Sequence, residues 1–153
     1  IKARFSMLTH SALAREAADA IIETMAIRIV RLGTPRHPKE GLRIGTARRP
    51  PRGVRKEDFA RRNYFDVWLP ELAPSAQLVS WLLSEAITPK LWADFARRYR
   101  REMRTPAAQR LVALLAALSL QTHFSVGCYC EDETRCHRSL LKKLLIEQSG
   151  QVV

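Results

Sequence analysis

The residues 124–145 constrain the fold of this sequence more than any other stretch. The run 124–129 is short, apolar and rich in aromatic and β-branched residues, which is typical of a buried strand. The acidic run 131–133 then returns the chain to solvent. Leucines recur after it at the spacing of a helix, at Leu140, Leu141, Leu144 and Leu145. The pattern predicts a strand that passes directly into a helix, and in open α/β sheets ligands collect at such crossings.

Shorter strands are predicted on the N-terminal side of the chain. Ile27 and Ile29 alternate with arginines, which indicates a half-buried first strand, and a second strand spans 42–47. Pro50 and Pro51 lack the N–H groups that a sheet ladder needs, so the basic stretch 48–53 is predicted to be a loop. The next expected element is a short helix over 56–62, and residues 65–69 are apolar and aromatic enough for an edge strand but too short to assign.

Three helices are predicted between these strands and residue 124. Ser75, Thr88 and Thr105 each carry a hydroxyl suited to a helix N-cap, and proline follows the two threonines at the first helical position. The third helix, over 106–120, is expected to pack across the sheet through one face: Leu111, Leu114, Leu115 and Leu118.

The order strand, strand, helices, strand, helix predicts the fold class. Long helical crossovers join parallel strands, so a small three-layer α/β sandwich with a mostly parallel sheet is favoured, with an α+β arrangement as the alternative. The length of 153 residues suits one domain. Residues 25–150 are predicted to form it. Residues 1–24 are predicted to be an extension, non-native or upstream of a true start at Met25, and an ordinary N-terminal helix is the alternative.

Charge and cysteine content limit the partners and the compartment. The formal net charge is +11, and residues 28–62 hold twelve Lys or Arg against three acids, which favours an anionic partner such as a nucleotide or nucleic acid. No apolar run approaches the roughly 18 residues of a membrane helix. Three clustered cysteines do not suggest a disulfide framework, so a reducing, cytoplasmic compartment is predicted.

The sequence resembles the YeaO-like family, a bacterial domain of unknown function numbered 488. The likeness covers about residues 27–145 and rests on four ordered motifs: 48–53 (RRPPRG), 72–75 (LAPS) with Trp81, 95–102 (FARRYRRE), and Cys130-Glu131 followed by Cys136-His137-Arg138. The resemblance implies a cytoplasmic α/β domain in which these are the marked residues. It implies no particular reaction.

The Cys/His/Arg motif suggests a thiol enzyme, in which Cys136, His137 and Cys130 are the candidate catalytic residues. A thiol near a helix start has a lowered pKa, and Arg138 could hold an oxyanion. The spacing does not match a cysteine phosphatase loop, in which five residues separate cysteine from arginine. Whether the chain is an enzyme stays open at this point.

Two other interpretations of the cysteines stay open beside this one. Cys128, Cys130, Cys136 and His137 have the ligand types of a zinc site, although Cys136 and His137 are adjacent, which is unusual for structural zinc. No other cofactor is suggested. Cys128 could instead be a packing residue, since free cysteine is often buried.

The arginines of the stiff loop predict ligand contacts. Arg48, Arg49 and Arg52 suit bidentate recognition of phosphate or carboxylate. Glu131 is expected to face the ligand, whereas Asp132 and Glu133 are expected to face solvent. The full set of ligand-binding candidates is Arg48, Arg49, Arg52, Glu131, Arg138, Tyr99 and Glu102.

The predicted function is binding of an anionic ligand in a cleft between the loop 48–53 and the turn 131–138. An enzyme would have one pocket that holds Cys130 or Cys136, His137 and Arg52 together. A non-enzymatic nucleic-acid-binding module would instead have a broad basic surface made by residues 48–62 and 97–104. A zinc-binding domain is the third alternative.

Overall fold

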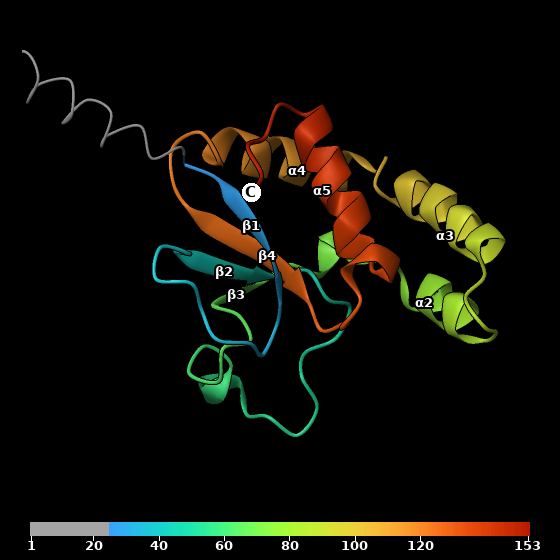
Figure 1. Ribbon diagram of the computed structural model, residues 1–153, viewed down its shortest axis with the longest axis horizontal. Coiled ribbons are helices and arrows are strands. Elements are labelled where there is room, and N and C mark those ends of the chain that lie inside the picture. The colour runs from blue at the N-terminus through green and yellow to red at the C-terminus, as the bar shows by residue number, and fades with distance from the viewer. Residues whose placement is uncertain (1–24) are drawn as a thin grey trace, which may run out of the picture.

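The computed structural model describes residues 25–153, which form a four-stranded parallel sheet with helices (Figure 1). The strands are β1 (Ile27–Arg31), β2 (Leu42–Gly45), β3 (Val67–Trp68) and β4 (Phe124–Cys128), in the spatial order β1-β4-β2-β3. Phe124 is the register partner of both Ile27 and Leu42. The predicted α/β class with a parallel sheet is confirmed.

The helices begin where the capping residues predicted. They are α2 (Ala76–Leu83), α3 (Pro89–Glu102), α4 (Pro106–Leu118) and α5 (His137–Glu147). The side-chain oxygens of Ser75, Thr88 and Thr105 each accept a hydrogen bond from a first-turn N–H group. These bonds satisfy donors that have no partner inside the helix, so each start is fixed locally.

Two elements are shorter than the sequence pattern suggested. The helix expected over 56–62 is reduced to a single 3₁₀ turn, η1 (Lys56–Asp58), and the stretch 65–69, too short to assign from the sequence, contains only the two-residue strand β3. Two more 3₁₀ turns, η2 (Pro70–Leu72) and η3 (Glu133–Arg135), lead into α2 and α5. Each short element lies at the edge of the sheet or outside it, where few neighbours extend regular pairing.

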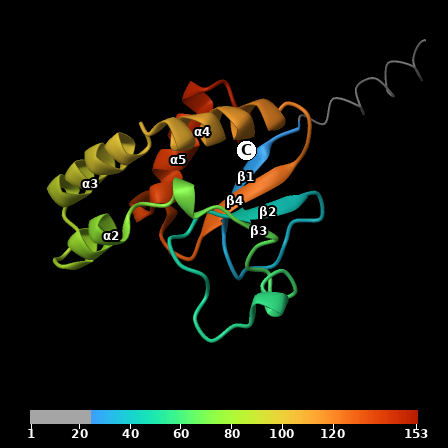
Figure 2. The ribbon, with the colours of Figure 1, turned by 180° about the vertical axis from the view of Figure 1, so that it is seen from behind.

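The main core lies between the sheet and the helices. Figures 1 and 2 show α4 and α5 together on one side of the sheet, with α2 and α3 beyond them. Ile27, Ile44 and Val126 from the sheet pack there with Leu141 and Leu145 of α5.

The inward face of α4 differs from the predicted one. Leu115 is buried as expected, but Leu114 and Leu118 are 53% and 39% exposed. The small residues Ala108 and Ala116 are buried instead. A side chain added at Gly150 would meet the Cα atom of Ala116 at 3.2 Å, so the chain after α5 approaches α4 closely where both residues are small.

The opposite face of the sheet is covered mainly by the long connection between β2 and β3 and contains a buried ion pair. Arg43 is fully buried and donates to Glu40 at 2.5 and 2.8 Å, and Ser125 also donates to Glu40. Two glycines allow other groups to approach the strands closely: Gly45 leaves room for Phe65, and Gly127 leaves room for Val30 and Leu32. A Cβ atom at Gly45 would clash with the Phe65 ring.

The two ends of the described chain lie beside β1. Val152 forms a parallel bridge with Ile27, and the Ile27 N–H group donates to Gln151 at 2.8 Å. The prediction for residues 1–24 falls outside the described residues. Within residues 25–153, no helix combines the length and the apolar character that crossing a membrane would require.

Candidate functional site

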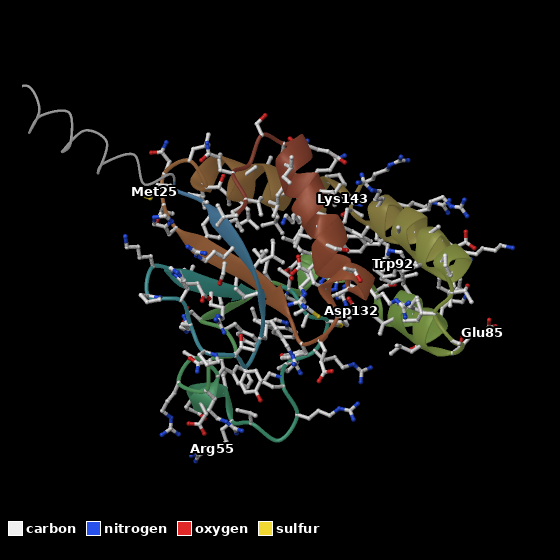
Figure 3. All side chains as sticks on the ribbon, viewed as in Figure 1. Met25, Arg55, Glu85, Trp92, Asp132 and Lys143 are labelled. Atoms are coloured by element: carbon white, nitrogen blue, oxygen red, sulfur yellow. The ribbon has the colours of Figure 1, made fainter. Side chains whose placement is uncertain are left out.

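A cleft of about 900 Å³ opens at the carboxyl ends of β2 and β4. Three segments form it: the loop after β2, the turn between β4 and α5, and α2. Figure 3 shows Asp132 at the N-terminal end of α5, where this turn meets the helix. The charged and reactive lining residues include Arg48, Arg49, Arg52, Cys130, Asp132, Arg135, Cys136 and His137. The parallel sheet therefore brings the two predicted segments, 48–53 and 131–138, to one cleft.

The three cysteines of the chain meet in this cleft. Their sulfur atoms all lie within 4.8 Å of one another, and the Sγ atoms of Cys128 and Cys130 are 3.8 Å apart. Cys128 and Cys136 are buried, whereas Cys130 is exposed. Hydrogen bonding from the Cys128 thiol, and then from Cys136, lowers the pKa of Cys130. Cys130 is therefore the accessible thiol, and Cys136 lies beneath it at the N-cap of α5.

His137 is held beneath the cleft surface. Its Nε2 atom lies 2.8 Å from the carbonyl oxygen of Thr46, at the end of β2, and its Nδ1 atom lies 3.8 Å from the Sγ atom of Cys136. Burial lowers the pKa of His137 to about 4, which keeps the ring neutral near pH 7. A neutral ring must donate through Nε2 to the carbonyl oxygen, so the lone pair is on Nδ1, toward Cys136.

The acidic residues of the turn are placed differently from the expectation. The Glu131 side chain points to solvent and pairs with Arg31 at 3.1 Å, while Asp132 lines the cleft. The expectation that Glu131 faces the site and Asp132 faces away is therefore wrong. Asp132 caps the turn η3 by accepting from Thr134, and this requirement fixes its position.

Arg138 supports the site from behind. Its side chain is 3% exposed and donates to the carbonyl oxygens of Cys130 and Glu131 at 2.8 and 3.3 Å. It does not line the cleft, so it holds the turn in place.

The arginines of the stiff loop have different roles. Arg48 donates to the carbonyl oxygens of Ala73 and Pro74 at 2.8 Å each, which fixes the loop against the start of α2. Arg49 and Arg52 are exposed and line the cleft. Arg48 is therefore a support for the loop, whereas Arg49 and Arg52 are exposed in the cleft.

Tyr99 and Glu102 have structural partners rather than positions in the cleft lining. The Tyr99 hydroxyl is buried and donates to Leu72 at 2.8 Å, and Glu102 accepts from both the N–H and the hydroxyl group of Ser75. Both residues join α3 to the segment before α2. Their place in the motif 95–102 fits this role.

Other cleft residues were missed in the sequence. Arg135 is exposed at the cleft, and Tyr129 lines it with a buried hydroxyl that has no partner among the described residues. α2 supplies an apolar wall that includes Val79 and Leu83. In the sequence, Arg135 and Tyr129 each lie directly next to a cysteine. This proximity could have identified them as cleft residues.

Comparison with protein-family models gives a match. A family model described as "Active DUF488-N3 subclade" matches residues 27–149, which is most of the chain. No curated protein and no solved structure matches the sequence.

Proposed function

The chain belongs to the active DUF488-N3 subclade of the DUF488 family, as its resemblance to the YeaO-like members predicted, and we propose that the cleft common to its marked motifs binds a phosphate-bearing anion. The ligand class is a nucleotide or a nucleotide unit of a nucleic acid. Arg52 and Arg49 contact the phosphate, and the thiols of the turn lie beside it.

The charge of the cleft supports an anionic ligand. Arg49, Arg52 and Arg135 line it with exposed guanidinium groups, against the single carboxylate of Asp132. Arginine matches the geometry of phosphate oxygens and can donate two hydrogen bonds to them at once. Because Arg48 fixes the loop to the segment before α2, the backbone beside it that carries Arg49 is held in place before a ligand arrives.

The apolar wall supports a ligand with a flat organic part. Val79, Leu83 and Ile87 line the cleft together with the charged groups, and Tyr64 contributes an aromatic ring. A volume of about 900 Å³ lies in the size range of small-molecule sites. A nucleotide carries both a base that suits such a wall and a phosphate that suits the arginines.

The start of α5 adds backbone donors. Cys136 is the N-cap residue and makes no side-chain capping hydrogen bond. The N–H groups of the first turn therefore lack the side-chain partner that Ser75, Thr88 and Thr105 supply to the other helices. The Ser139 N–H group donates to the Cys136 carbonyl oxygen at 3.0 Å, so the N–H groups of His137 and Arg138, together with the helix dipole, are what would favour an anion at this end.

The observation that carries the proposal is that Arg52, Cys130 and His137 line one cleft, although they come from two distant parts of the sequence. A pocket of this composition was expected of an enzyme, whereas a binding module was expected to have a broad basic surface without one. The exposed thiol of Cys130 lies in the same cleft as Arg52, so a reaction of this thiol with the bound anion is consistent with the arrangement.

Titration with a nucleoside diphosphate and with inorganic phosphate at low salt tests the proposal. Charge-assisted hydrogen bonds contribute about 1.5–3 kcal/mol each, so Arg52→Ala should weaken binding roughly ten- to a hundredfold. Arg55→Ala is the matched control, because Arg55 is exposed in the same connection, outside the cleft (Figure 3). Arg55→Ala should change affinity less than about threefold. Equal losses in both variants would show general charge attraction and would contradict a specific site.

A further inference from the structure

The thiol cluster has the geometry of a metal site. Cys128 comes from the end of β4, Cys130 from the turn after it and Cys136 from the N-cap of α5. Zinc binds thiolate sulfur at about 2.3 Å in a tetrahedral arrangement, which places bound sulfurs about 3.8 Å apart. The Cys128 and Cys130 sulfurs are separated by 3.8 Å, and no pair among the three exceeds 4.8 Å.

The charges around the cluster fit a metal–thiolate centre. Arg138 is a buried cation, and its hydrogen bonds go to carbonyl oxygens rather than to a carboxylate. Its Nε atom has no partner among residues 25–153. A buried charge without a counter-charge is costly. Three thiolates around one Zn²⁺ carry a net charge of −1, which would compensate Arg138 beside Cys130.

We propose that Cys128, Cys130 and Cys136 bind one Zn²⁺ ion, with the fourth coordination position open to the cleft. Thiolate ligands favour zinc among the common divalent ions. Cys130 is exposed in the cleft, so a metal bound to it faces the space that a ligand enters.

His137 is outside the ligand set. Its ring is tied to Thr46, and it does not belong to the group of ligand atoms that lie within 4.8 Å of one another. This assignment replaces the four-ligand set that includes His137. Zinc sites with three protein ligands and one open position are the catalytic type. The inference goes beyond the anion proposal and does not depend on it.

Elemental analysis of the full chain, purified with reductant and without chelator, tests the site. The wild type should hold about one zinc per chain, because one cluster of three thiols is present. Cys130→Ser should reduce the zinc content at least about tenfold. Cys130 is exposed, so this variant should keep its helical circular dichroism, although loss of a metal that binds the folded state should lower its melting temperature. Substitution with Co²⁺ should give sulfur-to-cobalt charge-transfer absorption that Cys130→Ser weakens.

Two further variants separate the possible outcomes. His137→Gln should keep the zinc, and loss of zinc from a folded His137→Gln protein would overturn the open fourth position. Arg52→Ala should keep the zinc while losing phosphate affinity, so failure of the anion proposal and failure of the metal site are distinguishable. A reduced wild-type chain that takes up neither Zn²⁺ nor Co²⁺ would overturn the proposal. So would cysteines found paired as a disulfide after purification.

Discussion

Glu40 and Arg43 form an ion pair that almost no solvent reaches. Glu40 is 2% exposed and Arg43 is fully buried. Burial alone would raise the pKa of Glu40, but hydrogen bonds from Arg43 and Ser125 lower it to about 2. Arg43 also donates to the carbonyl oxygens of Thr34 and Asn63, so the pair joins the loop before β2 to the segment before β3.

We predict that this pair makes the protein sensitive to acid. The folded pKa of Glu40 lies below its ordinary value of 4.5, so the stabilisation is complete above about pH 4.5 and is lost as the pH falls toward 2. Glu40→Gln should destabilise the fold by about 3–5 kcal/mol at pH 7, because Arg43 keeps a buried charge without a counter-charge. The variant should also lose part of the acid dependence. Chemical denaturation at pH 7, 4 and 3 measures both effects.

Glu57→Gln serves as the control for this prediction, since Glu57 is exposed in η1. It should change the free energy of unfolding by less than about 0.5 kcal/mol. If Glu40→Gln behaved in the same way, the ion pair would have no net role in stability.

Sequence reasoning could predict which residues meet in the site, but not the roles of all of them. The cysteines and the 48–53 loop were predicted to converge because carboxyl ends of parallel strands share one edge. Arg43, by contrast, alternates with apolar neighbours as an exposed residue would. Its burial depends on Glu40 and Ser125, and Ser125 lies 85 positions from Glu40, so no local pattern reveals it.

Among the elements, α2 and α3 are joined by two side-chain contacts at their ends. Glu102, the last residue of α3, accepts from Ser75, which in turn caps α2. The Arg98 guanidinium group lies 4.2 Å from the centre of the Trp81 ring. Since α2 supplies the apolar wall of the cleft, these contacts position that wall.

We predict that Glu102→Ala loosens α2. The change removes an acceptor from the capping residue, which should cost about 1–2 kcal/mol. Amide hydrogen exchange in residues 76–83 should become faster, and nucleotide affinity should fall severalfold. Glu85→Ala is the control, because Glu85 is exposed between α2 and α3 (Figure 3). Unchanged exchange in α2 after Glu102→Ala would contradict this role.

Element boundaries were predictable where the signal is local. Hydroxyl caps followed by proline fix helix starts within a few residues, so the starts of α3 and α4 were predicted correctly. The buried face of α4 was not, because leucines occur on more than one side of it. The chain at Gly150 lies so close to α4 that a small residue, Ala116, is needed on the buried face. This contact forms only in the folded chain.

For the whole molecule, the net charge of +11 raises the question of non-specific nucleic-acid binding. Arg97, Arg101 and Arg104 are exposed on and just after α3. Affinity for random-sequence duplex DNA should fall at least about tenfold between roughly 50 and 200 mM salt, because binding releases condensed counterions. Replacing these three arginines with Ala should weaken that binding, while nucleoside diphosphate affinity should change less than about threefold.

A triple variant of Lys90, at the other end of α3, Arg110 in α4 and Lys143 in α5 removes the same charge from scattered positions and is the matched control. Equal weakening in both triple variants would mean that DNA responds to net charge alone. If the α3 variant lost nucleotide binding too, the cleft and this surface would be one site.

The strand order has a consequence for the synthesis of this protein on the ribosome. β4 lies between β1 and β2, yet it follows three helices in the chain. Among the described strands, β1 has no partner other than β4. A nascent chain that ends before Phe124 therefore exposes an unpaired β1 and the apolar side of β2, which are surfaces that invite association with other chains. All three cysteines emerge after that point, so the thiol cluster assembles only when the sheet closes.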